Sequence, residues 1–311
     1  NIITDHGNDY YSAAYEIYNV ILLISSYSLP LAVSKVVSAR VALGEYRNSW
    51  RAFKGALYMA LVVGAAGSAL TFFGAGFFTG TLLNTPESEL CLKVLALAVF
   101  VMAVMGVLRG FFQGMGTMMP TAISQIIEQI VNAIVSIAAA SYLFSYGVKL
   151  DAAAGITNGK SGAIYGAAGS TLGTSLGAAA GLLFLIMVML MYNRVLQKSM
   201  RRDHVSRQES YASTLRVLIM TIVPVILSTA VYNISGIVDQ GVFKYLMLDV
   251  QKADKSTVEI YWGIYVGKYK LLTNVPIAVA SAMASSTIPV LTRARIAKDR
   301  KEMRRKTENA I

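Results

Sequence analysis

The sequence predicts an all-α polytopic membrane protein with about seven membrane-spanning helices. Hydrophobic residues make up 55% of the chain and charged residues 14%, whereas ordinary soluble domains are nearer a quarter charged. The apolar runs reach about 20 residues or more, the length that a helix needs to cross a bilayer. They are not the ~10-residue alternating segments of a barrel. The mean hydropathy of +0.54 agrees.

Charge and residue counts argue against several other classes of protein. The net charge of +11 would suit a nucleic-acid partner. The basic residues lie in a few loops between apolar runs, however, so we expect no nucleic-acid partner. The single cysteine, Cys91, excludes an internal disulfide. His6 and His204 lie far apart, so we expect no metal site and no resident cofactor. The chain begins with Asn1, and we expect natural sequence before it.

The predicted spans alternate with base-rich and base-poor loops. The spans run over about 11–39, 52–78, 90–112, 119–146, 163–193, 214–243 and 261–291. Most of the 28 Lys and Arg residues belong to alternate loops, at 35–54, at Arg109, at 194–216 and at 293–306. Because cytoplasmic loops carry the excess of basic residues, we expect Asn1 outside and Ile311 in the cytoplasm.

The first three spans carry few polar residues. The first contains one acid, Glu16, and one proline, Pro30, and ends at a basic loop. The second has no functional mark. The third ends in GVLRGFFQGMGTMMP, whose glycines predict a tight cytoplasmic turn with Arg109 and Gln113 as its polar members. A helix end with a snorkelling arginine is the alternative interpretation.

The fourth span carries a polar stripe. Its members recur at spacings of four, three, four and four, which places them on one helix face: Thr121, Gln125, Glu128, Asn132 and Ser136. In lipid such a face turns inward, and a charge near mid-membrane costs about 2.5–3.5 kcal/mol on insertion scales. The stripe therefore predicts either a cavity lining that includes Gln125, Glu128 and Asn132, or hydrogen bonds between helices.

The fifth span and the loop after it suggest packing and a boundary. Gly173, Gly177 and Gly181 form a small-residue ladder that lets a neighbouring helix approach closely. The basic loop at 194–213 is suited to lie on anionic lipids. We expect it to separate an N-terminal lobe, residues 1–193, from the start of a C-terminal lobe, residues 214–311.

The last two spans contain an acid and a base. Asp239 ends a polar stripe in the sixth span, after Pro224, a residue type that kinks helices. A lone acid in a span is a paired structural charge, a proton carrier or a cation ligand, and the sequence does not separate these. In the seventh span, Lys270 either snorkels outward or reaches inward to bind an anion.

Residues 10–47 resemble residues 261–301. Both segments open with a Tyr-rich turn, cross an apolar span, and end in small residues, a proline and a basic tail, as SSYSLPLAVSK and SSTIPVLTRAR show. Internal repeats of helix groups are typical of secondary transporters, which bind substrate between the halves.

Three segments carry a resemblance to a known family: YSLPLAVSKVVSARVALGEY, GVLRGFFQGMGTMMPTAISQIIEQI and SSTIPVLTRARI. The chain resembles bacterial polysaccharide biosynthesis transporters of the stage V sporulation protein B branch. These are similar to the lipid II flippases and belong to the multidrug/oligosaccharidyl-lipid/polysaccharide exporter superfamily. The resemblance covers essentially the whole chain. It implies a two-lobe, alternating-access transporter of about fourteen spans, of which this chain matches the second to the eighth.

The resemblance also implies roles for three residues. Lys270 aligns with a cavity arginine and becomes a ligand of the pyrophosphate head group, although lysine is a point charge without arginine's fork. Asp239 aligns with an acid that helps to bind sodium in some flippases, which implies Na⁺ or H⁺ coupling. Glu16 lies near the position of another cavity arginine, so the charge is reversed here.

These observations lead to one main hypothesis and three alternatives. The main hypothesis is a monomeric flippase for an undecaprenyl-linked cell-wall or polysaccharide precursor in the bacterial cytoplasmic membrane, with no covalent chemistry. The nearest alternative is a cation-coupled multidrug extruder of the same superfamily. A seven-helix receptor fits the span count but lacks an Asp-Arg-Tyr cluster, and a membrane glycosyltransferase would need charged groups gathered in a large loop.

Overall fold

The computed structural model describes residues 3–23, 29–154, 159–201, 203, 209–270 and 272–276. Every regular element within these residues is helical, which confirms the predicted all-α class. The main helices are α1 (Thr4–Leu22), α2 (Leu29–Ala42), α3 (Tyr46–Gly76), α4 (Glu89–Gly114), α5 (Met119–Ala153), α6 (Lys160–Arg201), α7 (Tyr211–Tyr245) and α8 (Lys255–Ile264). Short turns of other helix types extend or join them: η2 (Phe77–Leu82), η3 (Pro86–Ser88), η4 (Leu246–Val250) and η5 (Tyr265–Lys270).

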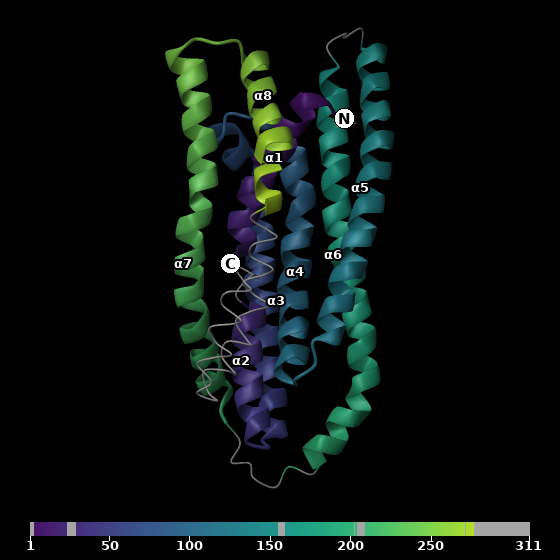
Figure 1. Ribbon diagram of the computed structural model, residues 1–311, viewed down its shortest axis with the longest axis vertical. Coiled ribbons are helices and arrows are strands. Elements are labelled where there is room, and N and C mark those ends of the chain that lie inside the picture. Colours follow the sequence, from purple (N-terminus) through teal and green to yellow (C-terminus); the bar gives the residue numbers. More distant parts are fainter. Residues whose placement is uncertain are drawn as a thin grey trace, which may run out of the picture.

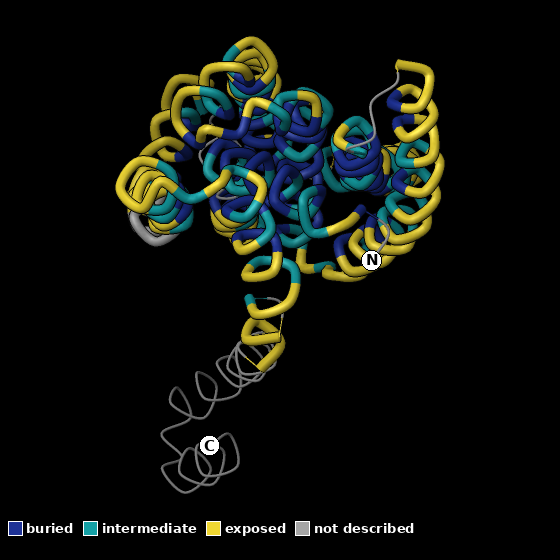
Figure 2. The backbone as a smooth tube through the Cα atoms, turned by 90° about the horizontal axis from the view of Figure 1, so that it is seen from above, coloured by how far each residue is buried: buried dark blue, intermediate teal, exposed yellow. Residues whose placement is uncertain are grey.

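The long helices run side by side along the molecule (Figure 1). We call the end where α5 ends and α8 begins the upper end, and the opposite end, where α2 meets α3, the lower end. Seen from above, buried residues gather in the middle of the bundle and exposed residues cover its periphery (Figure 2). Many of those exposed residues are large and apolar, as expected for surfaces that face lipid tails.

Four helical stretches in the described part of the chain are long and apolar enough to cross a membrane: Tyr46–Leu82, Pro86–Gly114, Met119–Ala153 and Lys160–Arg201. They match the second to fifth predicted spans. The first predicted span falls on α1 and α2 and includes residues 24–28, which lie outside the described residues. The sixth falls on α7, whose apolar stretch is Tyr211–Pro224. Most of the seventh, with Pro289, also lies outside the described residues.

Helix α4 is the centre of the bundle and packs against α1, α2, α3 and α6. Two of its glycines allow α2 to come very close. A Cβ atom at Gly110 would lie 2.6 Å from the carbonyl oxygen of Pro30, and one at Gly114 would lie 2.6 Å from Val37 Cβ. These glycines therefore serve helix packing, and the turn that follows α4 is made by Gly116, whose φ is +86°.

The glycine ladder of α6 packs against α5, as its spacing predicts. A Cβ atom at Gly173 would lie 2.0 Å from Ser136 Oγ, and one at Gly177 would lie 2.7 Å from the carbonyl oxygen of Glu128. The same helix continues to Arg201, so the first residues of the predicted loop at 194–213 are helical. Near the lower end, Arg40 of α2 donates a hydrogen bond from Nε to Glu209 Oε2 at 3.0 Å, which ties that loop's far end to the bundle.

Helices α7 and α8 both pack on α1, in opposite directions. Asp9 of α1 meets Lys244 of α7 and Glu16 meets Gly236, so α1 and α7 are antiparallel. Helix α8 and its continuation η5 run parallel to α1, because His6 meets Glu259 of α8 and Glu16 meets Lys270 of η5. The parallel pair approaches closely where a Cβ atom at Gly263 would lie 2.0 Å from the carbonyl oxygen of Asp5.

Candidate functional site

A cavity of about 370 Å³ lies between α1 and η5. Two of its lining residues contact each other: Lys270 Nζ donates a hydrogen bond to Glu16 Oε1 at 2.6 Å. The structure thus brings together the two residues that the sequence places in spans 254 positions apart. The cavity is lined by Asn8, Tyr11, Ser12, Tyr15, Glu16, Asn19, Val266, Gly267, Lys270 and Asn274.

Two elements other than its own helix contact the Glu16 side chain. Besides Lys270 of η5, it meets α7 at Gly236, where an added Cβ atom would lie 2.5 Å from Glu16 Oε2. The side chain of Glu16 is 15% exposed and that of Lys270 36%. A charged group at Glu16 is therefore largely withdrawn from water, and it depends on Lys270 for its compensation.

A second cavity, of about 360 Å³, shares Asn8 and Tyr11 with the first. The two are therefore adjacent parts of one concave surface along α1, and the second adds Asn132 and Ser136 from α5. Ser136 Oγ lies 2.9 Å from both Asn132 Oδ1 and the carbonyl oxygen of Ser170. The predicted stripe on the fourth span thus does contribute Asn132 to a cavity.

Most of the residues that line the two cavities have polar side chains, and their formal charges balance. Among the described residues that line them, Glu16 and Lys270 are the only charged ones. The remainder is mostly carboxamide, hydroxyl and phenol groups, and the rings of Tyr11 and Tyr15 stack with their centroids 5.4 Å apart. Such a surface offers many neutral hydrogen-bonding partners and a single displaceable cation.

The contact between Arg109 and Glu128 corrects the turn predicted for Arg109. For Glu128 it favours hydrogen bonds between helices over the predicted cavity lining. Arg109 donates to Glu128 Oε2 at 2.7 Å and to Ser124 Oγ at 3.0 Å, and both charged side chains are about nine-tenths buried. Glu128 therefore joins α5 to α4 and lines neither cavity. Arg109 lies inside α4, since that helix continues to Gly114. It is neither in the turn nor snorkelling.

Three other predicted residues also lie away from the two cavities. Gln125 is exposed on α5, and half-buried Gln113 lies in the last turn of α4 and not in the turn after it. Asp239 is exposed on α7, whereas its neighbour Gln240 is fully buried. No group of three or more His, Cys, Asp and Glu side chains within the described ranges is arranged to hold a metal ion, and the role of Asp239 stays a prediction.

The sequence did not single out Asp9 or Lys244. Lys244 Nζ of α7 lies 2.9 Å from Asp9 Oδ1 of α1 and also donates to the hydroxyl of Thr85, between η2 and η3. The side chains are 3% and 0% exposed. The spacing of these residues in the sequence could have identified them. Asp9 is seven residues before Glu16, and Lys244 is eight after Gly236, so each pair shares one helix face.

Comparison with known proteins agrees with this architecture. The lipid II flippase MurJ of Bacillus subtilis (strain 168) is 28% identical over 116 residues, which cover 35% of this chain and 21% of that flippase. The match thus spans about a fifth of the length of this curated relative. No solved structure matches the chain. The family described as "Polysaccharide biosynthesis protein" matches residues 1–295, and the chain therefore belongs to that family.

Proposed function

We propose that the protein is a flippase that moves an undecaprenyl-linked cell-wall or polysaccharide precursor across the bacterial cytoplasmic membrane by alternating access. Membership of the polysaccharide biosynthesis family and the similarity to a lipid II flippase support this class. The observation that carries the proposal is the Lys270–Glu16 pair in a cavity whose other lining residues mostly have neutral polar side chains.

The pair suggests how the diphosphate of such a substrate is held. Lys270 is the cation for one phosphate, and Glu16 neutralises it while the cavity is empty. A diphosphate carries more negative charge than one carboxylate and therefore displaces Glu16 from the ammonium group. Carboxamides such as Asn8 and Asn274, together with the stacked rings of Tyr11 and Tyr15, then face the sugar hydroxyls.

The contacts of α1 with α7 and α8 fit a boundary between moving lobes. In this proposal residues 1–193 and 214–311 belong to separate lobes, joined by the basic segment 194–213, which lies on anionic cytoplasmic lipids. The upper end is then outside, since it is poor in basic residues. Asp239 remains the proposed ligand of a coupling Na⁺ or H⁺, and the transporter works as a monomer without covalent chemistry.

Complementation of a strain that lacks its lipid II flippase tests the proposal. The full-length protein with Lys270→Ala should fail to restore growth, while its level in the membrane stays normal. Lys268→Ala is the matched control, because Lys268 is two residues away, 55% exposed and paired with Asp5 outside the cavity. Growth with Lys270→Ala equal to that with Lys268→Ala would rule out the head-group role.

A multidrug extruder is the second candidate. The Glu16 carboxylate beside the stacked rings of Tyr11 and Tyr15 is also suited to an organic cation. In that case, export of a cationic dye should depend on Glu16 and persist in Lys270→Ala. Dye export that is unaffected by Glu16→Gln would eliminate this candidate.

A further inference from the structure

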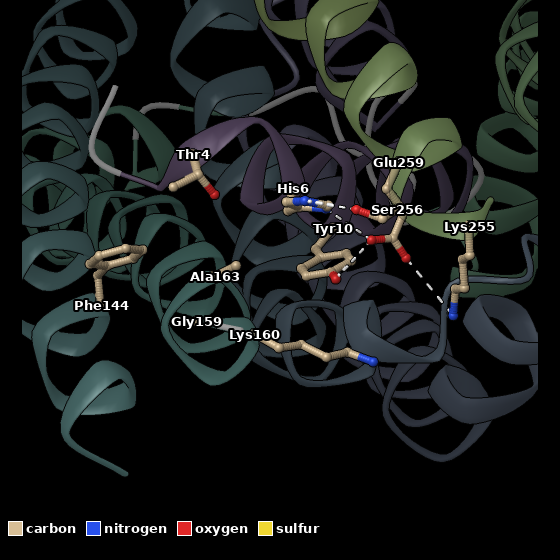
Figure 3. A pocket seen from close by; sticks show the side chains of 10 residues that line it. All are labelled: Thr4, His6, Tyr10, Phe144, Gly159, Lys160, Ala163, Lys255, Ser256 and Glu259. Carbon is tan, nitrogen blue, oxygen red and sulfur yellow. Dashed lines mark hydrogen bonds and ion pairs between the residues drawn. The ribbon is translucent and has the colours of Figure 1, made fainter. Parts of the chain in front are cut away.

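A separate cavity of about 390 Å³ lies at the upper end, outside the site described above (Figure 3). Its walls come from α1, α5, α6 and the start of α8, and it shares no lining residue with the two inner cavities. The residues that matter here are His6 and Tyr10 of α1, Phe144 of α5, Lys160 of α6, and Ser256 and Glu259 of α8.

Glu259 organises one wall of this cavity. Its Oε2 accepts a hydrogen bond from the Tyr10 hydroxyl at 3.0 Å and lies 3.0 Å from His6 Nδ1. That contact turns His6 Nε2 toward Ser256 Oγ, 3.4 Å away. Figure 3 shows this chain of contacts on one side of the cavity. The wall therefore presents a hydroxyl and an imidazole nitrogen whose positions are fixed by a buried carboxylate.

Two ammonium groups stand at the rim. Lys160 Nζ and Lys255 Nζ both contact Glu87 Oε1, at 2.7 and 3.1 Å, and their side chains are 48% and 43% exposed. One carboxylate oxygen is thus shared between two cations. Lys255 Nζ also lies 3.8 Å from Glu259 Oε1, so the two lysines and the two carboxylates form one connected network of charges.

The mixed lining selects among ligand classes. A free phosphate would compete with Glu87 for both lysines and would meet the carboxylate of Glu259. A simple cation would meet the two lysines, and an apolar ligand would strip water from all of these groups. A neutral polyhydroxyl ligand satisfies donors and acceptors together, and the Phe144 ring on the opposite side offers a flat apolar surface. The volume lies at the lower end of the ~300–1,000 Å³ that small-molecule sites occupy.

We propose that this upper cavity is a saccharide-binding site, formed where α1 meets α8, that takes a short neutral sugar chain. The proposal goes beyond the transport function and stands without it. The sugar comes either from a free glycan or from the carbohydrate part of a lipid-linked molecule, and both present the same hydroxyls.

Calorimetric titration of the purified full-length protein tests the site. One arm uses N,N′-diacetylchitobiose and maltose as free saccharides, and the other uses an undecaprenyl-diphosphate-linked disaccharide. All variants of the second arm carry Lys270→Ala, so that the inner cavity contributes little. The matched control is Tyr142→Ala, which removes a 74% exposed aromatic ring of α5 that does not line the cavity.

We expect Phe144→Ala to weaken binding at least about tenfold in whichever arm binds, and Ser256→Ala to weaken it less. Tyr142→Ala should have no effect, and the thermal unfolding of every variant establishes that it is folded. Binding in the first arm identifies free glycan as a ligand, and binding in the second arm alone identifies the lipid-linked form. Absence of saturable binding in both arms, or equal affinity of Phe144→Ala and Tyr142→Ala, overturns the proposal.

Discussion

Asp9 and Lys244 form an ion pair at 2.9 Å that joins α1 to α7 across 235 residues of sequence, with both side chains closed off from solvent. Removing one partner of a buried pair leaves an uncompensated charge, which costs about 3–5 kcal/mol. We therefore expect Asp9→Asn to lower the unfolding temperature of the detergent-solubilised protein markedly. An unfolding temperature equal to that of the native protein would contradict the pairing.

A double variant separates the charge from the packing. Replacing a buried ion pair by apolar residues of similar size is often neutral for stability. Asp9→Leu with Lys244→Met should thus recover most of the stability that Asp9→Asn loses. If the double variant is less stable than Asp9→Asn, side-chain volume and not the unpaired charge determines stability at this position.

Arg109 and Glu128 should behave as structural residues and not as substrate ligands. Their contact at 2.7 Å joins α4 to α5, and neither lines the inner cavities. Glu128→Gln should lower the free energy of unfolding by up to about 3–5 kcal/mol, while the affinity of the folded protein for lipid-linked substrate stays unchanged. Asn132→Ala, a cavity residue one turn away, should show the reverse pattern. Equilibrium binding and thermal unfolding of both variants check this.

Gly173 should tolerate no side chain. A Cβ atom there would lie 2.0 Å from Ser136 Oγ and 2.7 Å from backbone atoms of α5, so the helices must separate. Overpacking of this kind costs about 1–3 kcal/mol. Gly173→Ala should reduce the unfolding temperature, whereas Gly80→Ala should not, since a Cβ at Gly80 meets nothing within 4 Å. Equal stability of the two variants would exclude close α5–α6 packing at this point.

The sequence predicted the helices and their polar and packing faces better than it predicted which side chains contact each other between helices. Spacing alone identified the α6 ladder and the polar stripe on α5, because both depend on one helix. It could not tell that Glu128 turns to Arg109 while Asn132 turns to a cavity, since that depends on which neighbour lies beside each turn. The same limit explains why the sequence singled out Asp239 and not Lys244. The packing of α7 on α1 decides which face of α7 is buried, and that face carries Gln240 and Lys244.

The sequence predicted that Glu16 and Lys270 line one cavity, but it did not predict their direct contact. Their contact at 2.6 Å requires α8 to lie parallel to α1 and Gly236 of α7 to leave room for the carboxylate. Both conditions are properties of tertiary packing. The pair makes the Glu16 carboxylate a competitor of the substrate for Lys270. The Glu16→Gln variant should therefore bind a diphosphate-linked sugar more tightly. It should also show a smaller ratio of affinity for the diphosphate-linked over the monophosphate-linked sugar.

The most direct test of this account is the flipping of a fluorescent undecaprenyl-diphosphate-linked sugar in vesicles that contain the purified full-length protein. We predict that Lys270→Ala reduces flipping to the rate of protein-free vesicles, and that Glu16→Gln flips with half-saturation at a lower substrate concentration than the native protein. Flipping by Lys270→Ala at the native rate would contradict the central claim that this lysine holds the diphosphate.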